Sequence, residues 1–206
     1  MSPNPESLKT ACEALSLADH ALGTAYRICG VPEWRDRPVA YETIATTIAY
    51  QQISVKAAAS IWARVQAQFG IVTAAAISEA SEDSLRSCGL SRPKVRHMKS
   101  VAEACETGAL DLQRVAAAPI DEARAELLDV KGIGPWTAEL FLLYARGEMD
   151  AFPTADLGLM EAYKRLSGAD KRLDKADFIA LGETWRPWRG VAAHLLWAWL
   201  RHDRGS

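Results

Sequence analysis

The 206-residue sequence lacks the features that define several large classes of proteins. No stretch approaches the roughly 18 continuous apolar residues that a membrane-spanning helix needs. The chain does not begin with a basic segment, an apolar run and a small-residue cleavage site, so secretion is not predicted. Internal repeats, low-complexity tracts and long linkers are also missing. These absences favour a globular protein of the cytosol.

Cysteine and histidine occur without any metal-binding pattern. The four cysteines are scattered and form no CxxC pair: Cys12, Cys29, Cys88 and Cys105. The four histidines have no partners at metal or catalytic-triad spacing: His20, His97, His194 and His202. We therefore expect reduced, mostly buried thiols and histidines with structural roles. A structural disulfide is the less favoured alternative.

Positive charge is in short supply, since 24 basic side chains face 26 acidic ones and the net charge is −2. Phosphate binding depends mainly on lysine and arginine, so this balance argues against a nucleic-acid partner. Most of the basic residues lie beyond residue 91, and a local cluster occupies Arg92–Lys99. That cluster could form a basic face, although such a cluster is more often a solvated helix surface. Charge alone leaves the partner open.

Alanine- and leucine-rich segments without β-type alternation predict an all-α fold. No strand is convincingly predicted. The expected helices cover residues 8–29, 39–51, 54–69, 82–88, 93–106, 112–118, 119–128, 136–146, 156–166, 174–185 and 187–201.

The strongest local signal is Lys131-Gly132-Ile133-Gly134, which joins two predicted helices. Glycine permits a tight turn and a close approach to another molecule. Pro135 then presets the first helical φ angle, so the next helix would present free N–H groups and its positive dipole end. Such a helix start can bind a phosphate without basic side chains, and Lys131 adds one positive charge. Without its context, a Gly-x-Gly-Pro turn is more often only a turn.

The context changes that interpretation. The string Leu127–Phe141 resembles the helix-hairpin-helix DNA glycosylases, specifically the 3-methyladenine DNA glycosylase II branch. Four further segments match the same family, and the resemblance covers residues 40–200: Tyr50–Ser54, Cys88–Lys94, Asp150–Leu159 and Trp185–Trp197. The resemblance implies two helical lobes, approximately residues 38–118 and residues 1–37 with 119–206, and an active site in the cleft between them. It also implies a compact form, without the β-rich N-terminal domain of some bacterial members.

By resemblance, the catalytic aspartate of the family falls on Asp156. Cleavage of an N-glycosidic bond builds positive charge on the sugar, as in glycoside hydrolysis generally, and a nearby carboxylate stabilises that charge. It can also position or deprotonate the attacking water. The alternative role for an aspartate at a helix start is an N-cap. Asp150 is the competing carboxylate and is expected to anchor a loop.

The resemblance also identifies a base pocket. Trp136 stands where lyase-active relatives carry a lysine, and an indole cannot form a Schiff base, so hydrolysis without lyase activity is implied. Trp136 and Trp197 would stack on a flipped purine, and aromatic faces attract the positive charge of alkylated bases. Leu140 replaces a tyrosine found in some members, which leaves the substrate range open. Core packing is favoured for the remaining tryptophans of this region: Trp185, Trp188 and Trp199.

Other expectations concern the DNA contact and cofactors. Gln52 and Ile53 are the candidates for a wedge that fills the gap left by a flipped base, and a buried polar turn is the equally favoured alternative. Backbone carbonyls of Leu128, Val130 and Ile133 are expected to hold a monovalent cation. No cofactor is expected to be required, and the cysteines cannot form the iron–sulfur cluster of a related branch.

The sequence thus predicts a monofunctional DNA glycosylase that excises alkylated purines from double-stranded DNA. We expect it to act as a monomer in the cytoplasm, on the bacterial nucleoid, or in a nucleus. One alternative is a related glycosylase for oxidised or deaminated bases, which the pair Trp136 and Trp197 disfavours. Another is a non-catalytic DNA-binding protein that uses only the hairpin, which Asp156 argues against.

Overall fold

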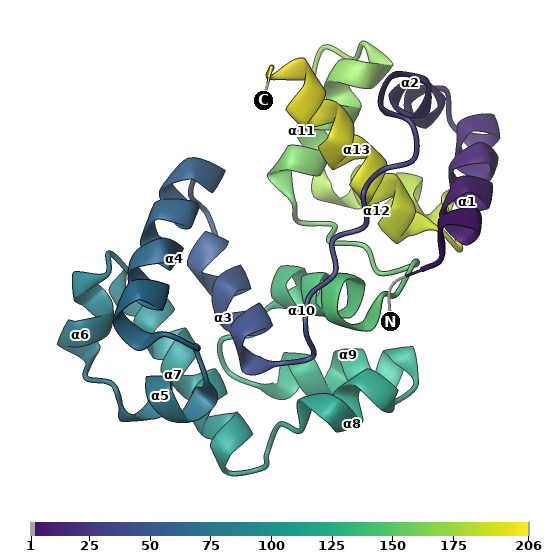
Figure 1. The fold of residues 1–206 in the computed structure, drawn as a ribbon. Coiled ribbons are helices and arrows are strands. Elements are labelled where there is room, and N and C mark those ends of the chain that lie inside the picture. The colour runs from purple at the N-terminus through teal and green to yellow at the C-terminus, as the bar shows by residue number, and fades with distance from the viewer. Residues whose placement is uncertain (1–2, 206) are drawn as a thin grey trace. The chain divides into compact units, whose positions relative to one another are not determined.

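The computed structural model describes residues 3–205, and all regular secondary structure in that range is helical, which confirms the all-α fold. The helices follow one another along the chain as shown in Figure 1: α1 (Pro5–Ala18), α2 (His20–Cys29), α3 (Tyr41–Tyr50), α4 (Val55–Phe69), α5 (Ala74–Glu79), α6 (Glu82–Ser87), α7 (Arg92–Glu106), α8 (Leu112–Ala117), α9 (Ile120–Asp129), α10 (Pro135–Phe141), the π-helical segment η1 (Leu142–Arg146), α11 (Leu157–Ser167), α12 (Lys175–Glu183) and α13 (Arg189–Asp203). None of the described helices is long and apolar enough to cross a membrane.

The chain divides into two compact units. Met1–Asp36 and Leu142–Ser206 form one, here called the terminal unit, and Arg37–Phe141 forms the central unit. The division differs from the expected lobes, because the hairpin groups with the central unit rather than with the segment that carries Asp156. The reason is packing: α9 packs on α8, and α10 packs on both α3 and α9.

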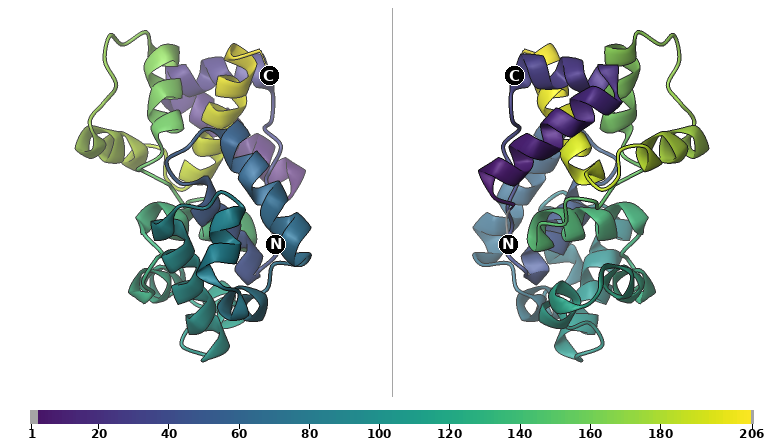
Figure 2. Two further views of the ribbon diagram at one scale, coloured as in Figure 1. Left: turned by 90° about the vertical axis from the view of Figure 1, so that its left-hand side faces the viewer. Right: turned by 90° about the vertical axis from the view of Figure 1, so that its right-hand side faces the viewer.

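The terminal unit is built around α13. Helices α1, α2 and α11 all pack against it (Figure 1). Trp185 is 1% exposed and lies against the rings of Phe152 and Phe178, and Trp199 is also buried. Core packing is therefore confirmed for these two tryptophans, and Trp188 packs partly buried against the same core. Figure 2 shows the extended loop that joins α11 to α12.

One expected helix is two helices in the structure. The predicted segment 8–29 breaks at Asp19, which takes an extended conformation with φ −144°. One carboxylate oxygen of Asp19 caps α2 by accepting the N–H groups of Ala21 and Leu22, and the other accepts the Tyr163 hydroxyl and the Trp185 indole N–H, each at 3.1 Å. These distant partners fix the break, and the local sequence does not reveal them.

In the central unit, two lysines of the basic cluster Arg92–Lys99 donate hydrogen bonds to backbone carbonyls near helix ends. Lys99 Nζ donates to the carbonyls of Ile77, Ser78 and Ala80 at the end of α5. Lys94 Nζ donates to the Ala49 carbonyl at 2.8 Å, near the end of α3, and burial lowers the pKa of this lysine. Helix α5 itself was not among the expected elements, although Thr73 provides it with a side-chain N-cap.

Candidate active site

The hairpin runs from the end of α9 at Asp129 to the start of α10 at Pro135, which confirms the expected first position for the proline. Gly132 has a φ of +107°, and a Cβ added there would lie 2.9 Å from the Cα atom of His97 in α7. Backbone conformation and space both require glycine at this position. Gly134 has an ordinary φ and open space around it. The space beside Gly134 is therefore open to an approaching ligand.

The tip of the hairpin is anchored by Ile133, which is 4% exposed and donates its N–H to the Val130 carbonyl at 3.0 Å. Lys131 is exposed beside it. The buried isoleucine holds the turn against the central unit, while Lys131 and Pro135, the first residue of α10, are exposed.

The hairpin backbone offers carbonyl oxygens, which are suitable ligands for a monovalent cation. Leu128 lies in the last turn of α9, where carbonyls have no helical N–H partner and the helix dipole is negative. The Val130 carbonyl accepts one N–H, and a carbonyl oxygen has a second lone pair. The carbonyl oxygens of Leu128, Val130 and Ile133 are therefore chemically suitable ligands for such an ion.

Asp156 is the N-cap of α11. Its Oδ1 atom accepts the Leu159 N–H at 3.0 Å and the Trp197 indole N–H at 3.4 Å. The carboxylate is partly buried. An ionised carboxylate has about four acceptor positions, so capping and electrostatic catalysis are compatible duties. The structure thus brings together two residues, Asp156 and Trp197, that the sequence assigned separately to catalysis and to the base pocket.

Gly158 makes room for this contact. A Cβ at Gly158 would lie 3.0 Å from Asp156 Oδ1 and 4.0 Å from Trp197 Nε1. A side chain would therefore crowd the carboxylate where it meets the indole. Its place two residues after Asp156 is the only sign in the sequence that Gly158 belongs to the site.

Three side chains that the sequence did not identify surround Trp197. The guanidinium carbon of Arg35 lies 5.5 Å from the centre of the Trp197 ring. The ring centres of Tyr144 and His194 lie 6.1 and 5.6 Å from it. Burial lowers the pKa of His194 to about 4, with a smaller contribution from the charges of Arg35 and Arg201. The ring is therefore neutral near pH 7.

Asp150 anchors a loop, as expected. The Arg189 guanidinium binds it with two hydrogen bonds, from Nε to Oδ1 at 2.9 Å and from Nη2 to Oδ2 at 2.8 Å, and the Arg189 backbone N–H adds a third to Oδ1 at 3.3 Å. Arg186 and Glu183 extend the same ion-pair network. With both oxygens engaged, Asp150 fixes the loop before Asp156 to the start of α13.

The remaining predicted site residues lie in the central unit. Trp136 is the second residue of α10 and is partly buried, and Leu140 is 5% exposed. Gln52 is exposed with a φ of +57°, and Ile53 is 38% exposed. The alternative of a buried polar turn is therefore wrong for these two residues. Their neighbour Gln51 is the anchored one, since its Nε2 donates to Thr137 Oγ1 of α10 at 2.9 Å.

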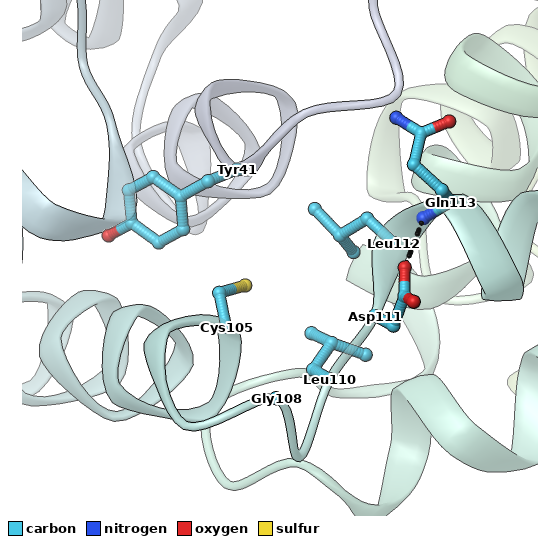
Figure 3. Close-up of a pocket in the computed structure, with 7 residues that line it drawn as sticks. All are labelled: Tyr41, Cys105, Gly108, Leu110, Asp111, Leu112 and Gln113. Carbon is cyan, nitrogen blue, oxygen red and sulfur yellow. Dashed lines mark hydrogen bonds between the residues drawn. The ribbon is translucent and has the colours of Figure 1, made fainter.

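The predicted site residues thus fall into two groups, one in each unit. Asp156 and Trp197 belong to the terminal unit, and the hairpin, Trp136, Leu140 and the Gln52–Ile53 tip belong to the central unit. The expectation that both groups line one cleft stays a prediction. A separate hollow in the central unit is lined by Tyr41, Cys105 and residues between Gly108 and Gln113, and it includes no predicted site residue (Figure 3).

Fold and hairpin together define the class: an all-helical protein with a glycine-turned helix-hairpin-helix motif followed by an aspartate at a helix start. A profile of the HhH-GPD superfamily of base excision DNA repair proteins matches residues 45–187. The chain belongs to this superfamily.

Individual relatives of the chain agree with this family assignment. DNA-3-methyladenine glycosylase 1 of Schizosaccharomyces pombe is 32% identical over 163 residues, which cover 76% of this chain and 71% of that protein. A probable bifunctional transcriptional activator/DNA repair enzyme AlkA of Mycobacterium tuberculosis is 33% identical over 162 residues, 74% of this chain but 32% of that longer protein. The structure of S. pombe Mag1 in complex with abasic DNA superimposes with a TM-score of 0.82 at 26% identity and covers 95% of this chain and 97% of that one.

Proposed function

We propose that this chain is a monofunctional DNA glycosylase that hydrolyses the N-glycosidic bond of alkylated purines and leaves an abasic site. Family membership and relatives that are named DNA-3-methyladenine glycosylases support the reaction and the substrate class. The structural observation that carries the proposal is the Asp156 carboxylate, held by the Leu159 and Trp197 N–H groups at the start of α11.

Asp156 acts through its charge. As the bond between base and sugar breaks, positive charge develops on the sugar, and a fixed carboxylate stabilises that charge more than it stabilises the neutral substrate. The N–H groups of Leu159 and Trp197 hold the carboxylate in one orientation. The same oxygens can orient the water that attacks the sugar.

We assign base recognition to Trp136 and Trp197, because an indole ring can stack on a flipped base. A lysine at the Trp136 position would allow a Schiff base with the sugar, but an indole has no amine to form one. We therefore infer hydrolysis without strand cleavage.

DNA is held by the hairpin, through backbone N–H groups at the start of α10 and the charge of Lys131. A monovalent cation bound by the carbonyls of Leu128, Val130 and Ile133 would add positive charge beside a phosphate. Gln52 and Ile53, exposed at the end of α3, are suited to enter the gap left by the flipped base. The partner is double-stranded DNA with an alkylated base, in a bacterial nucleoid or a nucleus. The enzyme is proposed to act as a monomer, which size-exclusion chromatography tests.

The test is release of free base from methylated duplex DNA by the wild-type protein and by Asp156→Asn. The asparagine oxygen can still cap α11, so the variant keeps the fold while losing the charge. We expect release to fall by at least about 100-fold, the order seen when one transition-state charge partner is removed. Release that persists in the variant would show that Asp156 is not the catalytic group. Strand breaks without alkali or heat would contradict hydrolysis alone.

A further inference from the structure

We propose that Arg35 is a specificity-determining residue that disfavours positively charged bases relative to neutral ones. This inference rests on the proposed function and adds to it, because it concerns which lesions the Trp197 side of the base pocket accepts. Residues of the terminal unit hold both the backbone and the side chain of Arg35.

The backbone of Arg35 is fixed by a buried histidine. His194 is 3% exposed, and its Nδ1 lies 2.8 Å from the Gly190 carbonyl. A carbonyl only accepts, so Nδ1 carries the proton and Nε2 is left as the acceptor. Nε2 then accepts the backbone N–H of Arg35 at 3.4 Å. Trp34, the preceding residue, stacks on the same histidine with ring centres 4.1 Å apart.

The side chain of Arg35 contacts the aromatic rings of Tyr144 and Trp197. Its Nη1 donates to the Tyr144 hydroxyl at 3.3 Å, and its guanidinium carbon lies 6.0 Å from the Tyr144 ring centre and 5.5 Å from the Trp197 ring centre. No Asp or Glu carboxylate pairs with Arg35 among the salt bridges of the described residues 3–205. The Arg35 guanidinium therefore lies over the ring of the pocket tryptophan, while the Asp156 carboxylate lies at the N–H edge of the same indole.

The positive charge of Arg35 should affect the binding of a flipped base according to whether that base is charged or neutral. An indole attracts cations through its ring faces, and Arg35 already lies over the Trp197 ring. A base with a formal positive charge, such as 7-methylguanine, would meet a like charge close to the indole. A neutral base such as hypoxanthine meets no such repulsion, and its carbonyl oxygen can accept a hydrogen bond from a guanidinium N–H.

The alternative role for an exposed arginine in a DNA-binding protein is a phosphate contact. The ring contacts and the Tyr144 hydrogen bond favour the pocket role, because they hold the guanidinium at the indole. The two roles also have different signatures. A phosphate contact supports all substrates equally and steepens the salt dependence, whereas a pocket charge changes the ratio between substrates.

The experiment measures single-turnover excision of 7-methylguanine and of hypoxanthine from otherwise identical duplexes, at a mildly acidic pH where 7-methylguanine keeps its charge. Arg35→Gln should raise the ratio of the 7-methylguanine to the hypoxanthine rate constant by about tenfold, as expected for removing one nearby unit charge in a partly solvated site. Arg35→Lys keeps the charge and should leave the ratio within about threefold of wild type. Tyr144→Phe should shift it in the direction of Arg35→Gln, but less.

Arg27→Gln is the matched control, since Arg27 is an exposed arginine of α2 in the same unit that bonds Thr24. It should leave the ratio unchanged. An unchanged ratio in Arg35→Gln, with wild type active, would overturn the inference and leave the proposed function standing. Equal losses on both substrates with a weaker salt dependence would also overturn it, in favour of a phosphate contact. A wild-type protein inactive on both bases would overturn the proposed function, and the inference with it.

Discussion

The Asp156 carboxylate illustrates how one side chain can serve structure and chemistry together. It caps α11 through the Leu159 N–H and receives the Trp197 indole N–H on the same oxygen. Local sequence favours the cap, since aspartate at a helix start usually has that role. Only the resemblance of the surrounding segments favoured catalysis. The structure adds the indole contact, which neither consideration predicts because 41 residues separate the two side chains.

His194 presents the opposite case, a histidine for which the sequence predicts only a structural role. Its ring is buried among Trp34, Tyr144 and Trp197, and both of its nitrogens have partners. The structural role is confirmed. Nevertheless, this histidine positions the segment that carries Arg35, and its contacts with residues 34 and 144 come from parts of the chain that no local pattern connects.

Burial of His194 predicts acid sensitivity. Its pKa is lowered from 6.5 to about 4, so between these values the unfolded chain binds a proton that the folded chain does not. The free energy of unfolding therefore falls as the pH drops from 6.5 to about 4, by roughly 3 kcal/mol in total. Urea unfolding at a series of pH values should show this loss in wild type. His194→Phe keeps an aromatic ring beside Trp34 and should lack that part of the loss, and parallel curves for the two proteins would refute this origin.

At the scale of elements, side-chain N-caps mark three helix starts within one residue of where the sequence predicts them. Ser54, Ser81 and Asp174 each cap a helix with their side chains. The predicted helix boundaries are wrong where tertiary contacts determine the backbone conformation. Asp19 interrupts a continuous helical pattern because Tyr163 and Trp185 bind its carboxylate, and the expected helix 136–146 changes to π-helical geometry at Leu142. Neither event has a proline or glycine to signal it.

The two hairpin glycines should respond differently to substitution. Gly132→Ala places a Cβ on a left-handed backbone and 2.9 Å from His97, so it should lower the free energy of unfolding by roughly 2 kcal/mol or more. Gly134→Ala meets open space and should leave stability unchanged or slightly higher. If a phosphate approaches Gly134 closely, the added methyl should weaken binding of an abasic duplex by about tenfold.

Urea unfolding and fluorescence anisotropy with labelled DNA separate these effects. The expected pattern is lower stability for the Gly132 variant, and normal stability with weaker binding for the Gly134 variant. Full DNA affinity in a stably folded Gly134→Ala protein would mean that the hairpin backbone is not the phosphate site.

For the whole molecule, the fold class and the family could be predicted because they depend on helix periodicity and on motifs that are contiguous in sequence. The division into units could not, because it depends on which helices α9 and α10 pack against. Part of the candidate site was also hidden for the same physical reason. Arg35, Tyr144 and Trp197 meet through the packing of α13 and the segment after α2, and the identity of each residue alone carries no sign of its neighbours.

The net charge of −2 gives a prediction for the molecule as a whole. If the hairpin binds phosphate mainly through backbone N–H groups, few lysine or arginine side chains neutralise phosphates, and few counterions are released on binding. The slope of the logarithm of DNA affinity against the logarithm of salt concentration should then be shallow, with a magnitude of about 3 or less. Lys131→Gln should reduce that slope by about 1, since it removes one of the few cations near the hairpin. A slope of about 6 or steeper would instead require a basic DNA-binding face, and the Arg92–Lys99 cluster would be the first region to test.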